Sequence, residues 1–507
     1  MKKKFLSMLI VSAVAVTAMG CSNNTNESSK SAASSNINVS VSDSSDESAS
    51  ADVKAKITLS NNSISAEGDG VEVVDKTITI NSGGTYEVSG TLEDGQIIVD
   101  SADEINVYIV FNGVDISCSN SAPIYVKSAK NTIITLADNS ENYLSDGSEY
   151  LYEELNDDGT VTDEPSACIF SKDDLTINGN GTLNVVGNYN NGIASKDDLK
   201  ITAGTAVNNG LKGKDSITIK GGEITVNSTG DGVKSDNTED TTKGYIIIEG
   251  GSLNITSGGD GIQAETTLTI SDGDINIVSG GGSSNAATHA ESFQMGPWAN
   301  PSNTSSSSSS ETGSAKALKA GTALTVDGGN INIDSADDSI HTNDTVMINT
   351  GIFHIKSGDD GIHADNVLEI NGGDINITDS YEGLEAAHIT VNDGNINLVA
   401  SDDGINAAGD GIDSIMPSKT CQSVIISTPE LVIGSSYSVY YGGNNSGSES
   451  NGLYTDGIAT SGTELTNFTL SSSVMTVSST GATEGVSGGM RAPGGMGGMQ
   501  GGGRLPR

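Results

Sequence analysis

The sequence has few aromatic and few basic residues. Aromatic residues make up 4% of the 507 positions, with one tryptophan, and 24 lysines and arginines stand against 66 aspartates and glutamates. The resulting net charge of −42 disfavours a nucleic-acid partner, because binding to phosphates depends on basic side chains. We therefore expect no nucleic-acid role.

The sequence also lacks the patterns of a disulfide framework and of common catalytic sites. Cys118, Cys168 and Cys421 are odd in number and widely spaced, so we interpret them as buried or incidental. There is no Gly-x-Ser-x-Gly elbow, no Cys/His signature, no His-Glu-x-x-His and no phosphate loop. We predict no catalytic residues.

Long hydrophobic runs are missing too, apart from one short run near the beginning. Residues 1–20 hold three lysines and then the apolar run 5–16, which is shorter than the ~20 residues of a membrane span and is typical of a signal peptide. Ala18-Met19-Gly20-Cys21 resembles a bacterial lipobox, so Cys21 is the expected lipid anchor; the alternative is an ordinary secretory signal. The polar residues 21–56 are interpreted as a flexible tether. This places the protein on the extracellular face of a bacterial cell membrane, touching the membrane through the lipid only.

Asp-Gly-Ile and close variants recur at nearly fixed spacing. The central small residues are separated by 18, 22, 29, 56, 22, 22, 22 and 21 residues; they are Gly192, Gly210, Gly232, Gly261, Ala317, Ser339, Gly361, Gly383 and Gly404. One unit, residues 359–377, contains three short alternating runs separated by Gly or Asn-Gly turns. The pattern predicts an all-β, right-handed parallel β-helix with about 20–22 residues per coil.

Equivalent positions of the repeat carry equivalent side chains. The residue after the small one is always aliphatic, and we expect these to stack inside; they are Ile193, Leu211, Val233, Ile262, Leu318, Ile340, Ile362, Leu384 and Ile405. We assign the β-helix to residues 57–413, with irregular capping coils over 57–136 and inserts at 139–165 and 280–316. Trp298, in the second insert, is either a sugar platform or a loop anchor. A small C-terminal β unit over 414–480 and a disordered Gly/Met-rich tail over 481–507 follow, and we expect a monomer.

Acidic residues recur just before the small residue. Stacked coils bring equivalent residues to about 4.8 Å, where like charges repel, so paired and stacked acids favour a bound cation. Carboxylates are ligands that Ca²⁺ prefers, and the alternative is a solvated acidic turn. The predicted calcium ligands are Asp337, Asp338, Asp359, Asp360, Glu382, Asp402 and Asp403.

A second outward column lies two positions after the small residue. It contains Lys234, Lys319, His341 and His363, which either contact acidic sugars or balance the charge of the acids. Tyr381, beside the acid column, completes the candidate carbohydrate-binding residues. His341 and His363 have the spacing of stacked neighbours, but with His354 on another face they do not form a convincing transition-metal set.

Several segments together resemble a known family. They include Asn188-Tyr-Asn-Asn-Gly-Ile-Ala-Ser-Lys-Asp-Asp-Leu199, Gly258-Gly-Asp-Gly-Ile-Gln-Ala-Glu-Thr266, Ser357-Gly-Asp-Asp-Gly-Ile-His-Ala-Asp365 and Ser401-Asp-Asp-Gly-Ile-Asn-Ala-Ala408. The chain is similar from about 57 to 474 to bacterial carbohydrate-binding domain-containing surface proteins, including a cellulose- and pectin-binding β-helix. The resemblance implies a calcium-carrying fold like that of pectate-lyase-type polysaccharide lyases. Gly411 follows Gly404 after only seven residues, so the solenoid is shortened relative to that family.

Three functions remain open. The first is non-catalytic binding of a polysaccharide, for which the scarcity of aromatics makes Ca²⁺-assisted binding of an acidic, pectin-like polymer more suitable than a flat cellulose platform. The second is a pectate-type lyase, with Lys234 or Lys319 as the base beside Ca²⁺. The third is a structural or adhesive surface spacer. We expect the first, and no enzyme activity.

Overall fold

The computed structural model describes residues 52–61, 63–152, 159–202, 204–286 and 314–407, with short stretches between 433 and 484. Contacts divide the chain into residues 1–38 and 39–507, and every described residue belongs to the second unit. The signal peptide, Cys21, Trp298, Cys421 and most of the tether lie outside the described residues. No helix within the described ranges is long and apolar enough to cross a bilayer.

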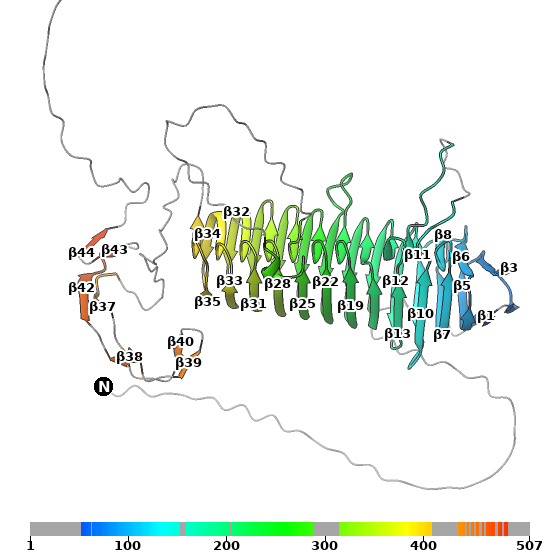
Figure 1. Ribbon diagram of the computed structural model, residues 1–507, viewed down its shortest axis with the longest axis horizontal. Helices are drawn as coiled ribbons and strands as arrows, with labels where there is room; N and C mark the ends of the chain where they lie inside the picture. Colours follow the sequence, from blue (N-terminus) through cyan, green and yellow to red (C-terminus); the bar gives the residue numbers. More distant parts are fainter. Residues whose placement is uncertain are drawn as a thin grey trace, which may run out of the picture. The chain divides into compact units, whose positions relative to one another are not determined.

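The described part of the chain is all-β. Thirty-six strands belong to one sheet, and the 3-10 turn η1 (Ser283–Asn285) is the helical element of the described ranges. The sheet pairings are parallel, except for the hairpin-like pairs β1–β2 and β3–β4 at its N-terminal end. Figure 1 shows the strands following one another in rows from β1 to β35.

In the middle of the sheet, each strand pairs with the third strand further along the chain, for example β14 with β17 and β17 with β20. The strands therefore form three ladders, which is compatible with a solenoid of three-stranded repeats.

Ladder 1 runs through β2 (Ser63–Gly68), β1 (Val53–Asn61), β5 (Gly84–Leu92), β7 (Val107–Cys118), β10 (Glu141–Asp146), β13 (Thr182–Val186), β16 (Gly204–Asn208), β19 (Glu223–Ser228), β22 (Ser252–Ser257), β25 (Asp274–Ser279), β28 (Asn330–Ser335), β31 (Ile352–Ser357), β33 (Asp374–Asp379) and β35 (Asn395–Leu398). Ladder 2 runs through β3 (Val71–Val74), β4 (Thr77–Ile80), β6 (Gln96–Asp100), β8 (Ile124–Ser128), β11 (Ala167–Ser171), β14 (Asn191–Ser195), β17 (Leu211–Gly213), β20 (Val233–Ser235), β23 (Ile262–Ala264), β26 (Leu318–Ala320), β29 (Ile340–Thr342), β32 (Ile362–Ile370), β34 (Leu384–Val391) and β36 (Ile405–Ala407). Ladder 3 starts at β7, ends in the long strands β32 and β34, and contains β9 (Thr132–Leu136), β12 (Leu175–Gly179), β15 (Asp198–Ile201), β18 (Ser216–Ile219), β21 (Tyr245–Ile248), β24 (Thr267–Ile270), β27 (Ala323–Val326) and β30 (Thr345–Ile348).

One continuous apolar core runs along the sheet. The predicted aliphatic column is in cross-strand register from Ile193 to Ile405, and its members from Ile193 to Leu384 are buried. Ile405 is the exception, with 43% of its surface exposed, because β36 pairs with β34 and no described strand covers its other side. Ile405 keeps the register of the column, but the prediction that it is buried there is wrong.

Glycines set the turns that enter ladder 1. Gly351 and Gly373 have φ angles of 128° and 102°, and an added Cβ at Gly373 would lie 2.9 Å from the carbonyl oxygen of Gly351. Stacked turns approach so closely that only glycine fits there without strain. This explains the glycine directly before the third run of these repeats, where Gly351 follows Thr350 and Gly373 follows Gly372.

The predicted insert at 139–165 begins too early. Residues 141–146 form β10, which pairs with β7 and β13 inside ladder 1. Its inward side chains are Asn142, Leu144 and Asp146, so two of three are polar and the hydrophobic alternation is absent. Asn142 Oδ1 accepts the backbone N–H groups of Gly113 and Val114 at 3.1 and 2.9 Å, which satisfies this buried amide.

The C-terminal region forms separate antiparallel two-stranded sheets. They pair β37 (Ser436–Tyr441) with β42 (Thr463–Thr469), β38 (Asn444–Asn445) with β41 (Ala459–Thr460), β39 (Ser448–Ser450) with β40 (Leu453–Thr455), and β43 (Met475–Ser478) with β44 (Gly481–Glu484). Strand β44 corrects the predicted tail at 481–507, because the first four residues of that range pair antiparallel with β43. Residues 485–507 lie outside the described residues.

Candidate functional site

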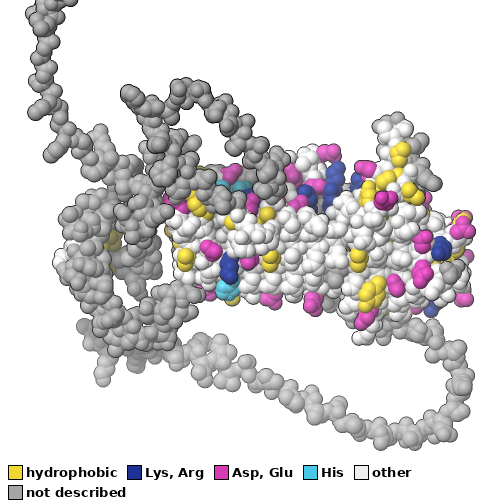
Figure 2. Space-filling model, viewed as in Figure 1, with side chains coloured by type: hydrophobic (Ala, Val, Ile, Leu, Met, Phe, Trp, Pro, Cys, Tyr) yellow, Lys and Arg dark blue, Asp and Glu magenta, His cyan; other side chains and the backbone are white. Residues whose placement is uncertain are grey.

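One polar side chain per repeat lies in register along the outer face of ladder 2. We call this row the polar ladder; its members are Lys212, Lys234, Gln263, Lys319, His341, His363, Glu385 and Asn406. In β20, β26 and β29 each of them stands between two buried residues, because alternate side chains of a strand face opposite sides. Histidine, lysine and acidic side chains gather along the upper edge of the described sheet in Figure 2. The structure therefore aligns four of the predicted sugar-binding residues, Lys234, Lys319, His341 and His363.

The residues just before the small residue of each repeat form what we call the acid column, and several of its acids are buried rather than solvent-facing. Asp260, Asp338 and Asp360 have 1%, 2% and 5% of their surface exposed. One oxygen of each carboxylate accepts a backbone N–H of the next repeat: Asp260 Oδ1 from Lys316 at 2.9 Å, Asp338 Oδ1 from Asp360 at 3.1 Å. Asp231 Oδ1 accepts the N–H of Asp260 in the same way, at 2.9 Å. The expectation that these acids point outward is corrected, because they satisfy backbone donors that the turns leave unpaired.

The second carboxylate oxygen pairs with the polar ladder. Lys234 Nζ lies 2.8 Å from Asp231 Oδ2, and His341 Nδ1 lies 2.9 Å from Asp338 Oδ2. Both contacts join residues three positions apart. Lys319 instead pairs with Asp260 of the preceding repeat, at 3.1 Å, because position 316 holds lysine where the acid would stand. The polar ladder thus balances the charge of the acid column.

Lys316 is the one lysine of the acid column within the described repeats. Its Nζ donates to Asp337 Oδ1 at 3.0 Å and to Asp338 Oδ2 at 2.5 Å. Burial would raise the pKa of Asp338, but hydrogen bonds from His341, His363 and Lys316 outweigh burial and hold this pKa well below its usual range. The lysine pKa is raised, since attraction to Asp338 and Asp337 exceeds the effect of burial.

Part of the predicted calcium set comes together. Carboxylate oxygens of Asp337, Asp338 and Asp359 lie within 4.8 Å of one another, whereas no such cluster in the described ranges contains Glu382, Asp402 or Asp403. Asp360 instead groups with His363 and Glu385. The three oxygen donors of the first cluster suit Ca²⁺, and Lys316 already supplies one positive charge there.

The C-terminal end of the polar ladder is acidic. Burial, then the nearby Glu385, Asp403 and Asp402, raise the pKa of Glu382 to about 7, although a hydrogen bond from Asn406 opposes this. Burial and a shared hydrogen bond with Asp360 raise the pKa of Glu385 to about 7. Asn406 Nδ2 donates to Glu382 Oε2 at 2.8 Å and to Glu385 Oε1 at 3.2 Å. No lysine or arginine pairs with this acidic end among the described residues.

Tyr381 does not join the polar ladder. It is half-buried in the turn, where its backbone N–H donates to Asp359 O and its carbonyl accepts from Asp402 N, at 2.7 and 2.9 Å. Tyr381 is therefore placed within the column of Asp337, Asp359 and Asp402, one residue before the acid column.

An aromatic cluster was missed by sequence reasoning. Tyr189 stacks on Tyr150 with ring centroids 4.3 Å apart and an interplanar angle of 18°, and Tyr152 meets both rings. Tyr189 is 39% exposed, whereas Tyr150 is buried and donates to Asp146 Oδ2 and Ala167 O. Tyr150 and Tyr152 lie on the first insert, outside the repeat, so no periodic pattern in the sequence predicted that they contact Tyr189.

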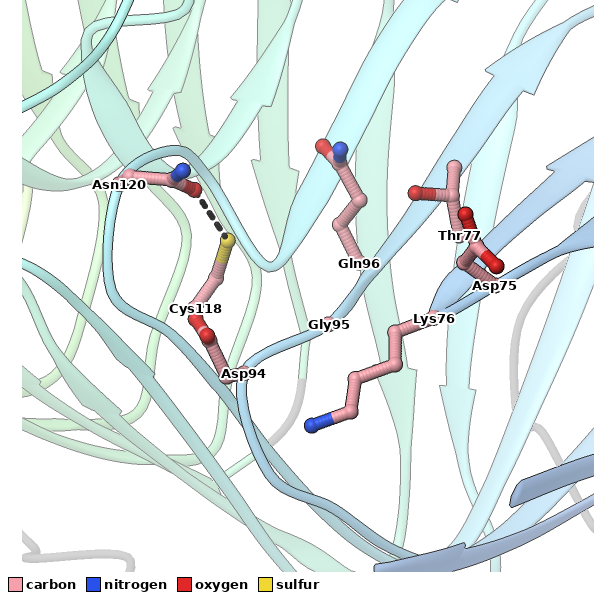
Figure 3. A pocket seen from close by; sticks show the side chains of 8 residues that line it. All are labelled: Asp75, Lys76, Thr77, Asp94, Gly95, Gln96, Cys118 and Asn120. Carbon is pink, nitrogen blue, oxygen red and sulfur yellow. Dashed lines mark hydrogen bonds between the residues drawn. The ribbon is translucent and has the colours of Figure 1, made fainter. Parts of the chain in front are cut away.

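A polar cavity of about 570 Å³ lies near the N-terminal end of the sheet (Figure 3). Its lining includes Lys76, Asp94, Cys118 and Asn120, and the Cys118 thiol donates to Asn120 Oδ1 at 3.8 Å. Burial raises the pKa of Cys118, so this thiol is poorly suited to act as a nucleophile. Cys118 and Cys168 are both free and buried, as predicted.

These features define an all-β protein with a long, mostly parallel sheet and a charged, in-register outer row. The sequence model of the carbohydrate-binding domain-containing protein family matches residues 74–361 and 346–414. The chain belongs to this family.

Two related proteins can be compared directly. A carbohydrate-binding domain-containing protein of Acetivibrio thermocellus is 45% identical over 145 residues, which are 28% of this chain and 49% of the relative. The match thus spans about half the length of that curated relative. A polysaccharide lyase-like protein from C. thermocellum, solved as a gadolinium derivative, is 41% identical, with a TM-score of 0.43; the match covers 45% of this chain and 92% of that one.

Proposed function

We propose that this protein is a non-catalytic, polysaccharide-binding surface protein whose sheet winds as a right-handed parallel β-helix. The polar ladder carries the proposal. Eight neighbouring strands of ladder 2, from β17 to β36, each present one polar side chain in register, at the ~4.8 Å spacing of neighbouring strands. A straight row of donors and charges suits an extended polymer better than a compact small molecule. Family membership supports a carbohydrate as the polymer.

Binding without cleavage fits the state of the lysines. A lyase needs a free lysine or arginine base beside the proton it abstracts. Lys234 and Lys319 instead form ion pairs with Asp231 and Asp260. Burial lowers the pKa of Lys234, but its hydrogen bond to Asp231 more than compensates and the pKa is raised, away from the range of a base at neutral pH. A lyase remains the second candidate, and a surface spacer the third.

The polymer we propose is acidic and pectin-like, and it binds with the help of Ca²⁺. Asp337, Asp338 and Asp359 would hold the ion, which supplies positive charge for sugar carboxylates next to an acidic protein. Lys319 and the two histidines of the polar ladder lie in the neighbouring strands β26, β29 and β32. The acid column and a polyanion carry like charges and repel each other. Cations bound between them would turn this repulsion into attraction.

The tyrosine cluster offers a second contact for sugar rings. One face of the Tyr189 ring stacks on Tyr150, and the residue is 39% exposed. Aromatic side chains combine an apolar face with a polar rim, which suits the C–H face and hydroxyls of a pyranose. Asn188 and Asn190, both exposed, flank Tyr189 and add amide groups.

We propose further that lipidated Cys21 and the tether hold the β-helix at the extracellular face of a bacterial membrane, as a monomer. Metabolic labelling with a lipid precursor tests the anchor, because Cys21→Ala should abolish incorporation of the label. Labelling that persists in this variant would contradict it.

Retention on immobilised polygalacturonate tests the binding function. The expected result is retention that a chelator abolishes and that the Lys234→Ala/Lys319→Ala variant loses, while Lys356→Ala, on ladder 1, retains it. Equal retention with and without chelator would contradict the proposed calcium bridge but would still support polysaccharide binding. Ultraviolet absorbance from unsaturated products would show a lyase, and failure to bind any of a panel of glycans would favour the spacer.

A further inference from the structure

Two histidines from consecutive repeats lie against buried carboxylates in the middle of the polar ladder. His341 of β29 and His363 of β32 are paired in register, and their ring centroids are 4.9 Å apart. Their Nδ1 atoms lie 2.9 and 3.7 Å from Asp338 Oδ2. Sequence spacing placed the histidines side by side, but only the fold shows that both rings direct the same nitrogen at one carboxylate oxygen.

We propose that Asp338, His341 and His363 bind one divalent transition-metal ion of the Zn²⁺ class. Their three ligand atoms all lie within 4.8 Å of one another. Zinc binds nitrogen and oxygen ligands at about 2.0–2.2 Å, which places neighbouring ligands of a tetrahedral site ~3.3 Å apart. The distances of 2.9 and 3.7 Å lie on either side of this value, so small side-chain movements would complete the site.

A fourth ligand is within reach. Asp360 Oδ2 lies 3.2 Å and Glu385 Oε2 lies 3.8 Å from the same Nδ1 of His363. Asp360 is buried and Glu385 is half-buried. Nδ1 of His363 thus faces carboxylates from three successive repeats. Because these carboxylates carry several negative charges, a dication bound to this nitrogen balances them better than a single proton does.

The outer nitrogen atoms of both rings are held as in metal sites. His341 Nε2 lies 3.2 Å from Asn343 Oδ1, and His363 Nε2 lies 3.5 Å from Asp365 Oδ1. A metal-bound imidazole usually donates its second N–H to a carboxylate or carbonyl oxygen, which fixes the tautomer and the ring orientation. Here Nδ1 of His341 faces Asp338, and Nδ1 of His363 lies between Asp360 and Asp338, at 3.2 and 3.7 Å.

The choice of metal follows from the ligands. Imidazole nitrogen suits Zn²⁺, Cu²⁺ and Ni²⁺, whereas Ca²⁺ prefers oxygen. The site therefore differs in chemistry from the oxygen cluster of Asp337, Asp338 and Asp359, although both include Asp338. Lys316 competes for Asp338 Oδ2, so its ammonium group weakens binding of a dication at this oxygen.

Zinc titration of the full chain, stripped with a chelator and followed by calorimetry, tests the proposal. We expect one Zn²⁺ to bind, excess Ca²⁺ not to displace it, and Co²⁺ in its place to give the intense visible absorption of a tetrahedral site. His341→Ala and His363→Ala should each abolish binding. His354→Ala, an exposed histidine of β31, should leave binding unchanged.

Two milder variants keep the test decisive if the histidine variants fold poorly. Asn343 is exposed, so Asn343→Ala should keep the fold while weakening Zn²⁺ binding by about tenfold through loss of ring orientation. Lys316→Met should tighten binding. Zinc uptake that is absent, or that is equal in wild type, the histidine variants and Asn343→Ala, would overturn the proposal.

Discussion

The Asp338 carboxylate accepts the backbone N–H of Asp360, its equivalent in the next repeat, at 3.1 Å. Its other oxygen accepts from Lys316 and His341. One buried side chain therefore ties together consecutive turns and the charged row beside them.

Asp338→Ala should lower the free energy of unfolding by about 3–5 kcal/mol, because it removes one of the two ion-pair partners of the half-buried Lys316 and leaves the backbone N–H of Asp360 without its acceptor. Chemical denaturation in a chelator measures this effect without any contribution from metal. The exposed Glu223→Ala should change stability by less than ~0.5 kcal/mol. A comparable small loss in Asp338→Ala would mean that this carboxylate does not hold the turns together.

Ile362 and Ile405 occupy the same column but differ in burial, at 0% and 43% exposed. Ile362→Asp should destabilise the protein by several kcal/mol, since it buries a charge without a partner. Ile405→Asp should cost far less. Thermal melting of both variants checks the register, and similar melting temperatures would show that the column is not in the core as described.

The acidic end should make stability fall as pH rises. Glu382 and Glu385 have pKa values raised from 4.5 to about 7, so the folded state holds their protons more tightly than the unfolded state. Their stabilising contribution is complete below the unfolded value and is lost as pH rises through about 7. In a chelator, Glu382→Gln/Glu385→Gln should be less sensitive to pH than wild type between about pH 5 and 8. Identical pH profiles would contradict this assignment.

Calcium should stabilise the protein if the oxygen cluster holds it. A ligand that binds only the folded state raises the melting temperature by mass action. Ca²⁺ should raise the melting temperature of wild type and of His354→Ala but not of Asp337→Asn/Asp359→Asn. A rise that survives in the double variant would place calcium elsewhere.

Tyr189→Ala should weaken retention on polysaccharide, because it removes the exposed ring of the tyrosine cluster. Tyr143→Ala is the matched control, since Tyr143 is 46% exposed in β10 and lies outside this cluster. Affinity electrophoresis in glycan-containing gels measures both. If the mobility of Tyr189→Ala is unchanged, the tyrosine cluster does not bind the polysaccharide, and the polar ladder is the remaining candidate surface.

Sequence reasoning reached the repeat and its core because both depend on local periodicity. A spacing near 22 residues and alternation of period two predicted which aliphatic residues stack, and the register confirms them from Ile193 to Leu384. Strand β10 was missed because Asn142 and Asp146 occupy its inward positions, where hydrogen bonds replace apolar contacts. The contacts of Tyr150 and Tyr152 were missed because the insert that carries them has no periodic sequence pattern.

The sequence by itself determined which residues share a column, since the recurring Asp-Gly-Ile motif marks the equivalent residues even where an insert changes the spacing. Only the tertiary structure decided what each column faces. The acids turned out to be buried, because the turns of stacked repeats leave backbone donors that a carboxylate one repeat earlier can reach. The position of Lys316 and the direction of the two Nδ1 atoms toward Asp338 depend on contacts between repeats, which a linear pattern does not contain.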